Sequence, residues 1–126
     1  MTTGKQRAFC AKFMGWTWGM VDSSFGHDSD SEILPAWVDN QGDLVCWVKD
    51  YRPESNTPEG REQANKLIME LVKRKIYPEI YVGARESLCE LYSDKWRDPF
   101  RAQGLFWNAA LTEAVAELQM EREKNG

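Results

Sequence analysis

The sequence predicts an α+β fold in which an antiparallel sheet of about four strands is covered by helices. Two observations support this class. Three segments carry apolar residues at helical spacing, and short β-branched or aromatic runs come in pairs joined by tight turns. Strands joined by short turns pair antiparallel, because a parallel crossover requires a dozen or more residues. The expected order is α-β-β-α-β-β-α, and a length of 126 residues suits one domain spanning residues 1–126.

The first element is a short helix over residues 7–14 that ends at a glycine. Its apolar stripe runs along one side from Phe9 to the end of the helix. Gly15 stands where a left-handed C′ residue would stop the helix, and Trp16 follows at C″, where it packs back on the last turn. Residues 1–5 are small and polar and are expected to fray.

A polar segment over residues 20–32 follows and is expected to be a loop. Asp28, Asp30 and Glu32 alternate with serines there, but the central glycine and terminal glutamate of a calcium loop are not at the required positions. No metal site is therefore expected. His27 is the single histidine, and the sequence offers it no nucleophile partner, so no catalytic role is expected.

Two strands are predicted on either side of a turn at residues 39–43. Residues 33–38 form the first strand, and Pro35 restricts it to a sheet edge or a strand start. The turn is rich in Asp, Asn and Gly, which tolerate a positive φ. Residues 44–48 are β-branched and aromatic and form the second strand, so the two are expected to pair antiparallel.

An extended linker over residues 51–56 leads into a long helix. Thr57 suits the N-cap of this helix and Pro58 its first helical position. From Ala64 onward, apolar residues repeat at helical spacing on one side. The helix is therefore expected to run to about Lys73 with one buried face.

Two further strand candidates, residues 80–82 and 86–92, precede the last helix. Asp98 is expected to cap that helix, with a proline in its first turn. Gly104 inside the helix costs about 1 kcal/mol relative to alanine. It therefore marks either a close helix–sheet contact or the true start of the helix. Residues 120–126 are expected to form an exposed, charged tail.

The acidic charge balance disfavours nucleic acid as a partner. The chain has 20 acidic and 16 basic residues, with a net charge of −4, and the two signs are interleaved. Proteins that follow phosphate backbones present clustered positive charge. The densest basic run, residues 73–75, falls at an expected helix end, where the macrodipole favours cations. Duplex nucleic acid is therefore not an expected partner.

The three cysteines, Cys10, Cys46 and Cys89, lack the spacing of a disulfide framework or a zinc site. They are expected to be buried reduced thiols, as in a cytosolic protein. No apolar run is long enough to span a membrane, and the basic N-terminus is not followed by the apolar stretch of a signal peptide. The expected location is therefore the cytoplasm, with no membrane partner and no cofactor.

Three short segments resemble the phage ABA-sandwich domain family of small phage and prophage proteins. Residues 9–16 are similar to the family's opening helix, which ends in Met-Gly-Trp. Tyr51, Pro53 and Ser55 lie in a segment similar to its entry into a long helix, and residues 107–111 are similar to the alanine-rich start of its last helix. The resemblance implies an accessory protein made in a bacterial host cell, from a class that often acts against host defence. It implies no catalytic residues, because the family's activity is undefined.

We therefore expect a non-enzymatic protein that binds and inhibits a host protein complex or sequesters a nucleotide-type small molecule. Binding surfaces favour Trp, Tyr and Arg, an aromatic ring can stack on a base, and Ser55 beside a helix N-terminus could receive a phosphate. Alternatively, Trp16 and Trp47 belong to the core and Ser55 only makes the turn. The predicted binding residues are Trp18, Trp47, Tyr51, Arg52 and Ser55.

Two other functions stay open from the sequence. A small hydrolase, with or without a metal, would use the clustered carboxylates Asp22, Asp28, Asp30 and Glu32, although their spacing fits no recognised acid–base or metal pattern. A structural or virion component would form a homo-oligomer through the exposed face of the last helix. DNA mimicry is disfavoured, because a mimic requires a far denser negative surface.

Overall fold

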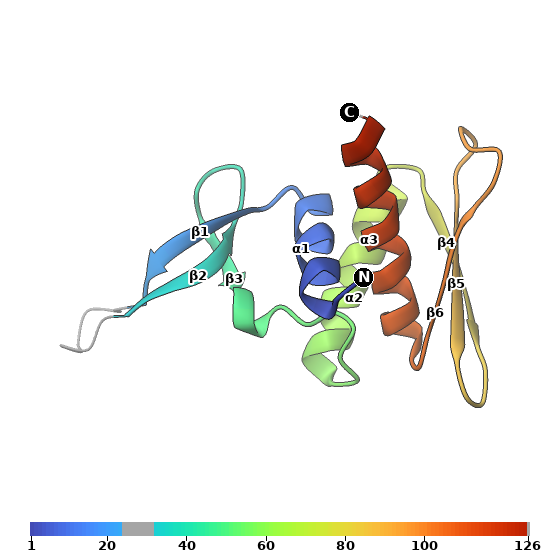
Figure 1. Ribbon diagram of the computed structural model, residues 1–126, viewed down its shortest axis with the longest axis horizontal. Coiled ribbons are helices and arrows are strands. Elements are labelled where there is room, and N and C mark those ends of the chain that lie inside the picture. Colours follow the sequence, from blue (N-terminus) through green and yellow to red (C-terminus); the bar gives the residue numbers. More distant parts are fainter. Residues whose placement is uncertain (24–31, 126) are drawn as a thin grey trace.

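The computed structural model describes residues 1–23 and 32–125 and confirms an α+β fold with antiparallel strands. Figure 1 shows the helices in the middle of the molecule, with a three-stranded sheet at each end. The order along the chain is α-β-β-β-α-β-β-β-α, so six strands replace the expected four or so. The helices form a central layer between two small sheets and do not cover a single sheet.

Helix α1 (Thr3–Phe13) begins earlier than expected, because Thr2 caps it by accepting a hydrogen bond from the Lys5 amide at 3.3 Å. The start of the chain, which was expected to fray, is therefore helical. The predicted end of the helix is confirmed. Gly15 has a φ of +85°, and the amides of Gly15 and Trp16 donate to carbonyls of the last turn at 2.9 and 3.0 Å.

Sheet A consists of β1 (Thr17–Asp22), β2 (Ile33–Val38) and β3 (Leu44–Trp47), in that order and all antiparallel. The predicted hairpin is confirmed as β2 and β3. The expected loop start at Met20 is wrong, because residues 17–22 pair in register with β2. The stretch predicted as a loop from its Asp and Ser content lies mostly in residues 24–31, outside the described residues, with His27, Asp28 and Asp30.

A short 3₁₀ helix, η1 (Val48–Asp50), and a linker join sheet A to α2 (Pro58–Lys73). The predicted cap is confirmed, since the Thr57 hydroxyl oxygen accepts a hydrogen bond from the Gly60 amide at 3.0 Å. At the other end, Arg74 pairs with Glu70 at 2.9 Å and lies over a ring of α1. The densest basic run of the sequence thus includes a residue that fixes α2 on α1.

Sheet B consists of β4 (Tyr77–Val82), β5 (Ser87–Tyr92) and β6 (Phe100–Gly104), also antiparallel and in chain order. The expected helix start at Asp98 is wrong, because β6 follows instead and α3 (Trp107–Asn125) begins later. A Cβ on Gly104 would lie 2.6 Å from the backbone nitrogen of Ala110. The glycine therefore marks a close strand–helix contact, which was one of its two expected roles.

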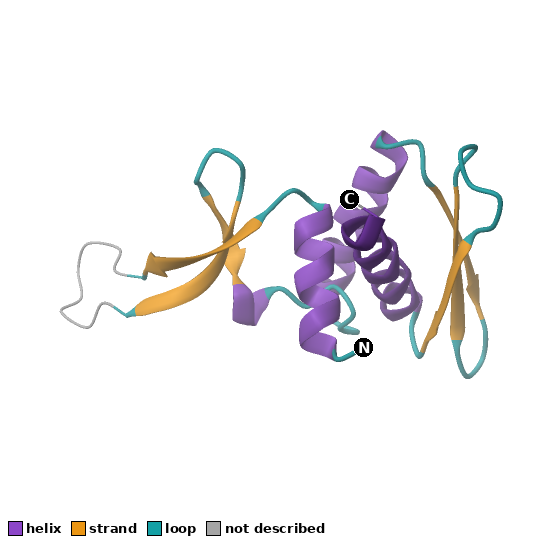
Figure 2. Ribbon diagram, turned by 45° about the horizontal axis from the view of Figure 1, so that its top comes forward, coloured by secondary structure: helices purple, strands orange, loops and turns teal. Residues whose placement is uncertain are grey.

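Helix α3 holds the core together, because it packs on α1 and covers one face of sheet B (Figure 2). Where α1 meets α3, the small side chain of Cys10 is fully buried, and its thiol donates a hydrogen bond to the Thr112 carbonyl at 3.3 Å. Small residues let helix axes approach closely, so this contact fixes the centre of the molecule. In the described part of the chain, no helix combines the length and apolar character needed to cross a bilayer.

Candidate functional site

The structure separates Trp18 and Trp47, the two tryptophans that the sequence predicted as binding residues. Trp18 lies opposite Trp37 in the register of β1 and β2, whereas Trp47 lies opposite Ala36. Neighbouring residues of a strand point to opposite faces, so Trp18 and Trp47 are on different faces of sheet A. They do not form one binding surface.

Tyr51 is in the core, as only 1% of it is exposed. Its ring contacts Trp16 edge-on, with the ring centroids 5.3 Å apart. Burial raises the pKa of the Tyr51 hydroxyl, which makes no hydrogen bond to the described residues. Tyr51 is therefore not available to stack on a ligand, although the sequence predicted it as a binding residue and the core alternative named only Trp16 and Trp47.

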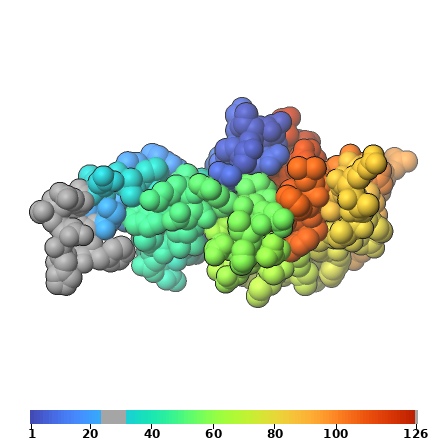
Figure 3. Space-filling view, turned by 90° about the horizontal axis from the view of Figure 1, so that it is seen from below, coloured from blue at the N-terminus to red at the C-terminus, as the bar shows by residue number. Residues whose placement is uncertain are grey.

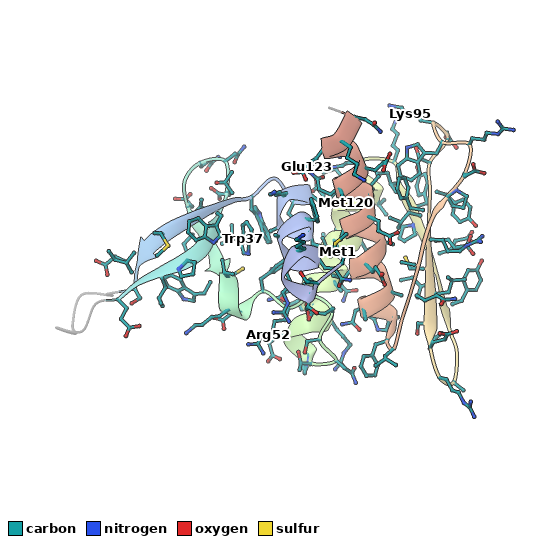
Figure 4. All side chains as sticks on the ribbon, in the orientation of Figure 1. Met1, Trp37, Arg52, Lys95, Met120 and Glu123 are labelled. Atoms are coloured by element: carbon teal, nitrogen blue, oxygen red, sulfur yellow. The ribbon has the colours of Figure 1, made fainter. Side chains whose placement is uncertain are left out.

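Arg52 and Ser55 have structural roles in the linker. The Arg52 amide donates to the Gln63 side chain at 2.7 Å, and its guanidinium donates to the Lys49 carbonyl at 2.9 Å. The Ser55 carbonyl accepts a hydrogen bond from the buried side-chain amide of Asn108 at 2.7 Å. In Figure 4, Arg52 extends from the linker, away from the helices.

The N-terminus of α2 is closed by the linker itself. The Thr57 hydroxyl already accepts from the Gly60 amide, and a Cβ on Gly60 would lie 2.3 Å from the Ser55 carbonyl oxygen. A phosphate at this helix end would have to displace backbone that is packed against it. The structure therefore gives no support to a phosphate site at Ser55.

The face of sheet A that carries Trp37 is apolar; it is buried next to the helices and exposed beyond them. Trp37, on the central strand, is 4% exposed and belongs to the core. The same face continues outward through Trp18, Met20, Ile33 and Pro35, because these residues share the register of Trp37. We call these four residues the projecting face.

The projecting face exposes large side chains to solvent. Trp18 is 58%, Met20 52% and Ile33 66% exposed. Together their exposed parts reach roughly 300–400 Å², the size of the largest apolar patches on monomeric proteins. Figure 1 and Figure 3 show sheet A as a lobe that extends beyond the helices of the described residues. An apolar surface of this size on a projecting lobe is typical of a protein-binding site.

Charge on the projecting face does not suit a nucleotide. Among the described residues, the charged side chain in the same register is Asp22, an acid, opposite Ile33. A phosphate group is recognised by Arg, Lys or a row of backbone amides. The described part of this face therefore favours a protein surface over a phosphorylated ligand.

A groove of about 730 Å³ between α1 and α3 is the second candidate site. Lys5 and Lys12 line one wall, and three glutamates of α3 line the other. Burial and the neighbouring Glu113 raise the pKa of Glu117. Three carboxylates would repel the phosphates of a nucleotide, and Lys12 already pairs with Glu123 at 3.5 Å. In Figure 4, Met1 and Met120 mark the side of the molecule where this groove lies. The groove is lined by Met1, Lys5, Ala8, Phe9, Lys12, Phe100, Glu113, Glu117, Met120 and Glu121.

The cysteines are poor nucleophiles here. Burial, with a smaller contribution from Glu54, raises the pKa of the Cys10 thiol far above its ordinary value. Burial likewise raises the pKa of Cys46 to about 11 and that of Cys89 to about 12. Only the thiolate attacks or binds metal, so these thiols are inert near neutral pH. Within residues 1–23 and 32–125, no group of three His, Cys, Asp or Glu side chains is arranged to hold a metal ion.

Sequence reasoning missed Met20 and Ile33, the two partners of Trp18 on the projecting face. The signal for them was the alternation of Trp18, Met20 and Asp22 with smaller residues, which has the period of a strand. The polar composition that follows concealed this period.

No protein-family model, curated protein or solved structure matches this chain. The surfaces of the chain itself are therefore the basis for inferring its function.

Proposed function

We propose that this chain is a non-enzymatic accessory protein that binds a partner protein through the projecting face of sheet A. The observation that carries the proposal is the exposure of Trp18, Met20 and Ile33 side by side on one face. Tryptophan at the centre of an interface often contributes about 2 kcal/mol or more, roughly a thirtyfold change in affinity. Trp18 is the aromatic anchor of this surface, and Met20 adapts to the partner because its side chain is flexible.

The partner is a protein and not a nucleotide. The projecting face offers a flat apolar area with an acid beside it, and the linker occupies the helix N-terminus where a phosphate was expected. An area of roughly 300–400 Å² is about half of one side of a standard interface, so a polar rim must complete it.

The resemblance to small phage proteins supports a host defence component as the partner, inhibited in the cytoplasm of a bacterial cell. In this account the chain acts by occupying a surface of that component, and it requires no catalytic group. A hydrolase would use the carboxylates near the β1–β2 connection, of which Asp28 and Asp30 lie outside the described residues. A virion component would instead bind copies of itself or other virion proteins.

Affinity capture from the bacterial cells that make the protein tests this proposal. Three forms are compared: the wild type, Met20→Glu and the matched control Met69→Glu. Met69 is 71% exposed on α2, so the control places the same charge on an open site outside sheet A. We expect a protein that the wild type and Met69→Glu retain and that Met20→Glu loses by at least about tenfold, since a charge must be desolvated at the interface.

Retention of the same proteins by all three forms would contradict the proposal. Light scattering on the wild type and a search of purified virions separate self-association and a structural role from partner binding. Incubation with cyclic and linear nucleotides in Mg²⁺ or Mn²⁺ tests the hydrolase alternative, because turnover would refute a non-enzymatic role.

A further inference from the structure

The outer face of sheet B carries a cluster of tyrosines and glutamates. Helix α3 covers the inner face, where Cys89 and Leu91 are fully buried. The residues that alternate with them point outward, away from the helices. This outer surface also carries Leu88 and Gln103. We call its tyrosines and charged residues the tyrosine face: Tyr77, Glu79 and Tyr81 on β4, Glu90 and Tyr92 on β5, and Arg101 on β6.

Two carboxylates of the tyrosine face lie directly opposite each other. Glu79 and Glu90 are partners in the β4–β5 register. Like charges at such positions destabilise a sheet unless other groups compensate them. Glu90 is compensated, since it accepts hydrogen bonds from Tyr92 at 2.5 Å and from Arg101 at 3.2 Å.

The negative charge of Glu79 is compensated less than that of Glu90. It accepts a hydrogen bond from the Tyr81 hydroxyl at 2.7 Å, and no basic side chain of the described residues forms an ion pair with it. Arg101 is on β6, two strands and about 10 Å away from β4. Arg101 forms its ion pair with Glu90 on the central strand and not with Glu79, so Glu79 keeps its negative charge at the β4 edge.

Aromatic rings flank this carboxylate on its own strand. Tyr77 and Tyr81 are two residues before and after Glu79, which places each about 7 Å along the strand from it. They are 49% and 52% exposed. A cation over a tyrosine ring is attracted by the negative face of the ring, and a carboxylate beside it adds a charge-assisted hydrogen bond.

We propose that Tyr77, Glu79 and Tyr81 bind an arginine side chain from a basic segment of a partner protein. Charge complementarity selects the cation, and the planar guanidinium suits this site because it stacks on a ring while it donates to a carboxylate. The Tyr92 ring, opposite Tyr77 in the register, extends the aromatic surface for the neighbouring residues of the segment. The tyrosine face and the projecting face lie at opposite ends of the molecule. The proposal of an arginine site can therefore be refuted without refuting partner binding through the projecting face, and the reverse also holds.

A defined peptide tests this site. The probe is a fluorescein-labelled peptide of alternating arginine and serine, and its binding is measured by fluorescence anisotropy at low salt, where exposed charges are least screened. Glu79→Gln is compared with Glu86→Gln, which removes the same charge from the exposed β4–β5 turn. We expect Glu79→Gln to weaken binding about fivefold or more and Glu86→Gln less than about twofold.

The tyrosines supply a second comparison. Tyr77→Phe keeps the ring and should bind nearly as the wild type does, whereas Tyr77→Ala should lose affinity about as much as Glu79→Gln. Unfolding curves confirm that each variant is folded. Equal weakening by Glu79→Gln and Glu86→Gln would overturn the proposal, because it would show a general attraction to an acidic protein. The absence of binding to the wild type at about 1 mM peptide would overturn it as well.

Discussion

Trp18 and Trp37 lie directly opposite each other across β1 and β2, yet Trp18 is 58% exposed and Trp37 only 4%. The difference arises because β2 is the central strand, packed on the helical core, whereas β1 is an edge strand. One apolar face of sheet A is therefore core at its inner strand and surface at its outer edge.

The two tryptophans are predicted to differ sharply in their effect on stability. Trp18→Ala should change the free energy of unfolding by about 0.5 kcal/mol or less, because its side chain is mostly in water. Trp37→Ala should cost about 3–5 kcal/mol, because it leaves a cavity in the core. Urea unfolding followed by circular dichroism measures both. A loss above about 2 kcal/mol for Trp18→Ala would show that this ring packs on the protein.

Asn108 is predicted to be the polar residue that holds the linker on α3. It is fully buried, and its side-chain amide donates to the Pro53 and Ser55 carbonyls at 2.8 and 2.7 Å. Asn108→Ala leaves both carbonyls without this partner and should cost about 2–4 kcal/mol. Asn65→Ala, at an exposed position of α2, is the control and should cost far less. Similar losses in the two variants would refute the role given to Asn108.

Gly104 and Gly4 are predicted to respond to alanine in opposite directions. A methyl group at Gly104 would meet Ala109 and Ala110 at 2.6–3.0 Å, so Gly104→Ala should destabilise the protein by about 1–3 kcal/mol. Gly4 lies in α1, and a methyl group there would have no neighbouring atom within 4 Å, so Gly4→Ala should stabilise the protein by up to about 1 kcal/mol. Thermal unfolding distinguishes the two. If Gly104→Ala is neutral, β6 and α3 are not in close contact.

Glu90 is predicted to contribute stability that is lost in acid. Hydrogen bonds from Tyr92, and then Arg101, lower its pKa below the ordinary value of 4.5. Its contribution is therefore complete above the unfolded pKa and declines as the pH falls through the lower folded pKa. Glu90→Gln should be less stable than the wild type at about pH 7, and the difference should narrow below about pH 4.

The hydrogen bond from Tyr92 to Glu90 can also be checked by spectroscopy at high pH. It raises the pKa of Tyr92 to about 12. Glu90→Gln should return the pKa of Tyr92 toward the ordinary tyrosine value. Absorbance at about 295 nm follows the ionisation of the tyrosine hydroxyl. Glu86→Gln is the control, and a matching change in that variant would rule out a specific Glu90–Tyr92 bond.

Local signals in the sequence were enough to predict the end of α1, the start of α2 and one hairpin. The start of α2 at Thr57 and Pro58 depends on hydrogen bonds within a few residues, and so does the end of α1 at Gly15. The residue types at these positions therefore predict both helix ends. The β2–β3 hairpin was equally clear, because a short turn separates two β-branched runs. These features depend on neighbours in the chain.

The missed strands depend on the elements that pair with them and cover them, and not on their own composition. β6 (Phe100–Gly104) contains Arg101 and Gln103 and follows a proline, so it has the composition of a helix start. It is a strand because β5 provides its hydrogen bonds and α3 covers Ala102. The packing of Tyr51 in the core is of the same kind, since no local pattern distinguishes a buried tyrosine from a binding one.

Site-specific photo-cross-linking at Met20 tests the central claim most directly. p-Benzoylphenylalanine is placed at position 20 or, as the control, at position 69, and intact bacterial cells that make the protein are irradiated. Both positions are more than half exposed, so only the location differs. We expect a discrete adduct with a different protein from position 20 and none from position 69. The absence of an adduct at position 20, an adduct only with a second copy of the chain, or the same adduct from both positions would contradict partner binding through the projecting face.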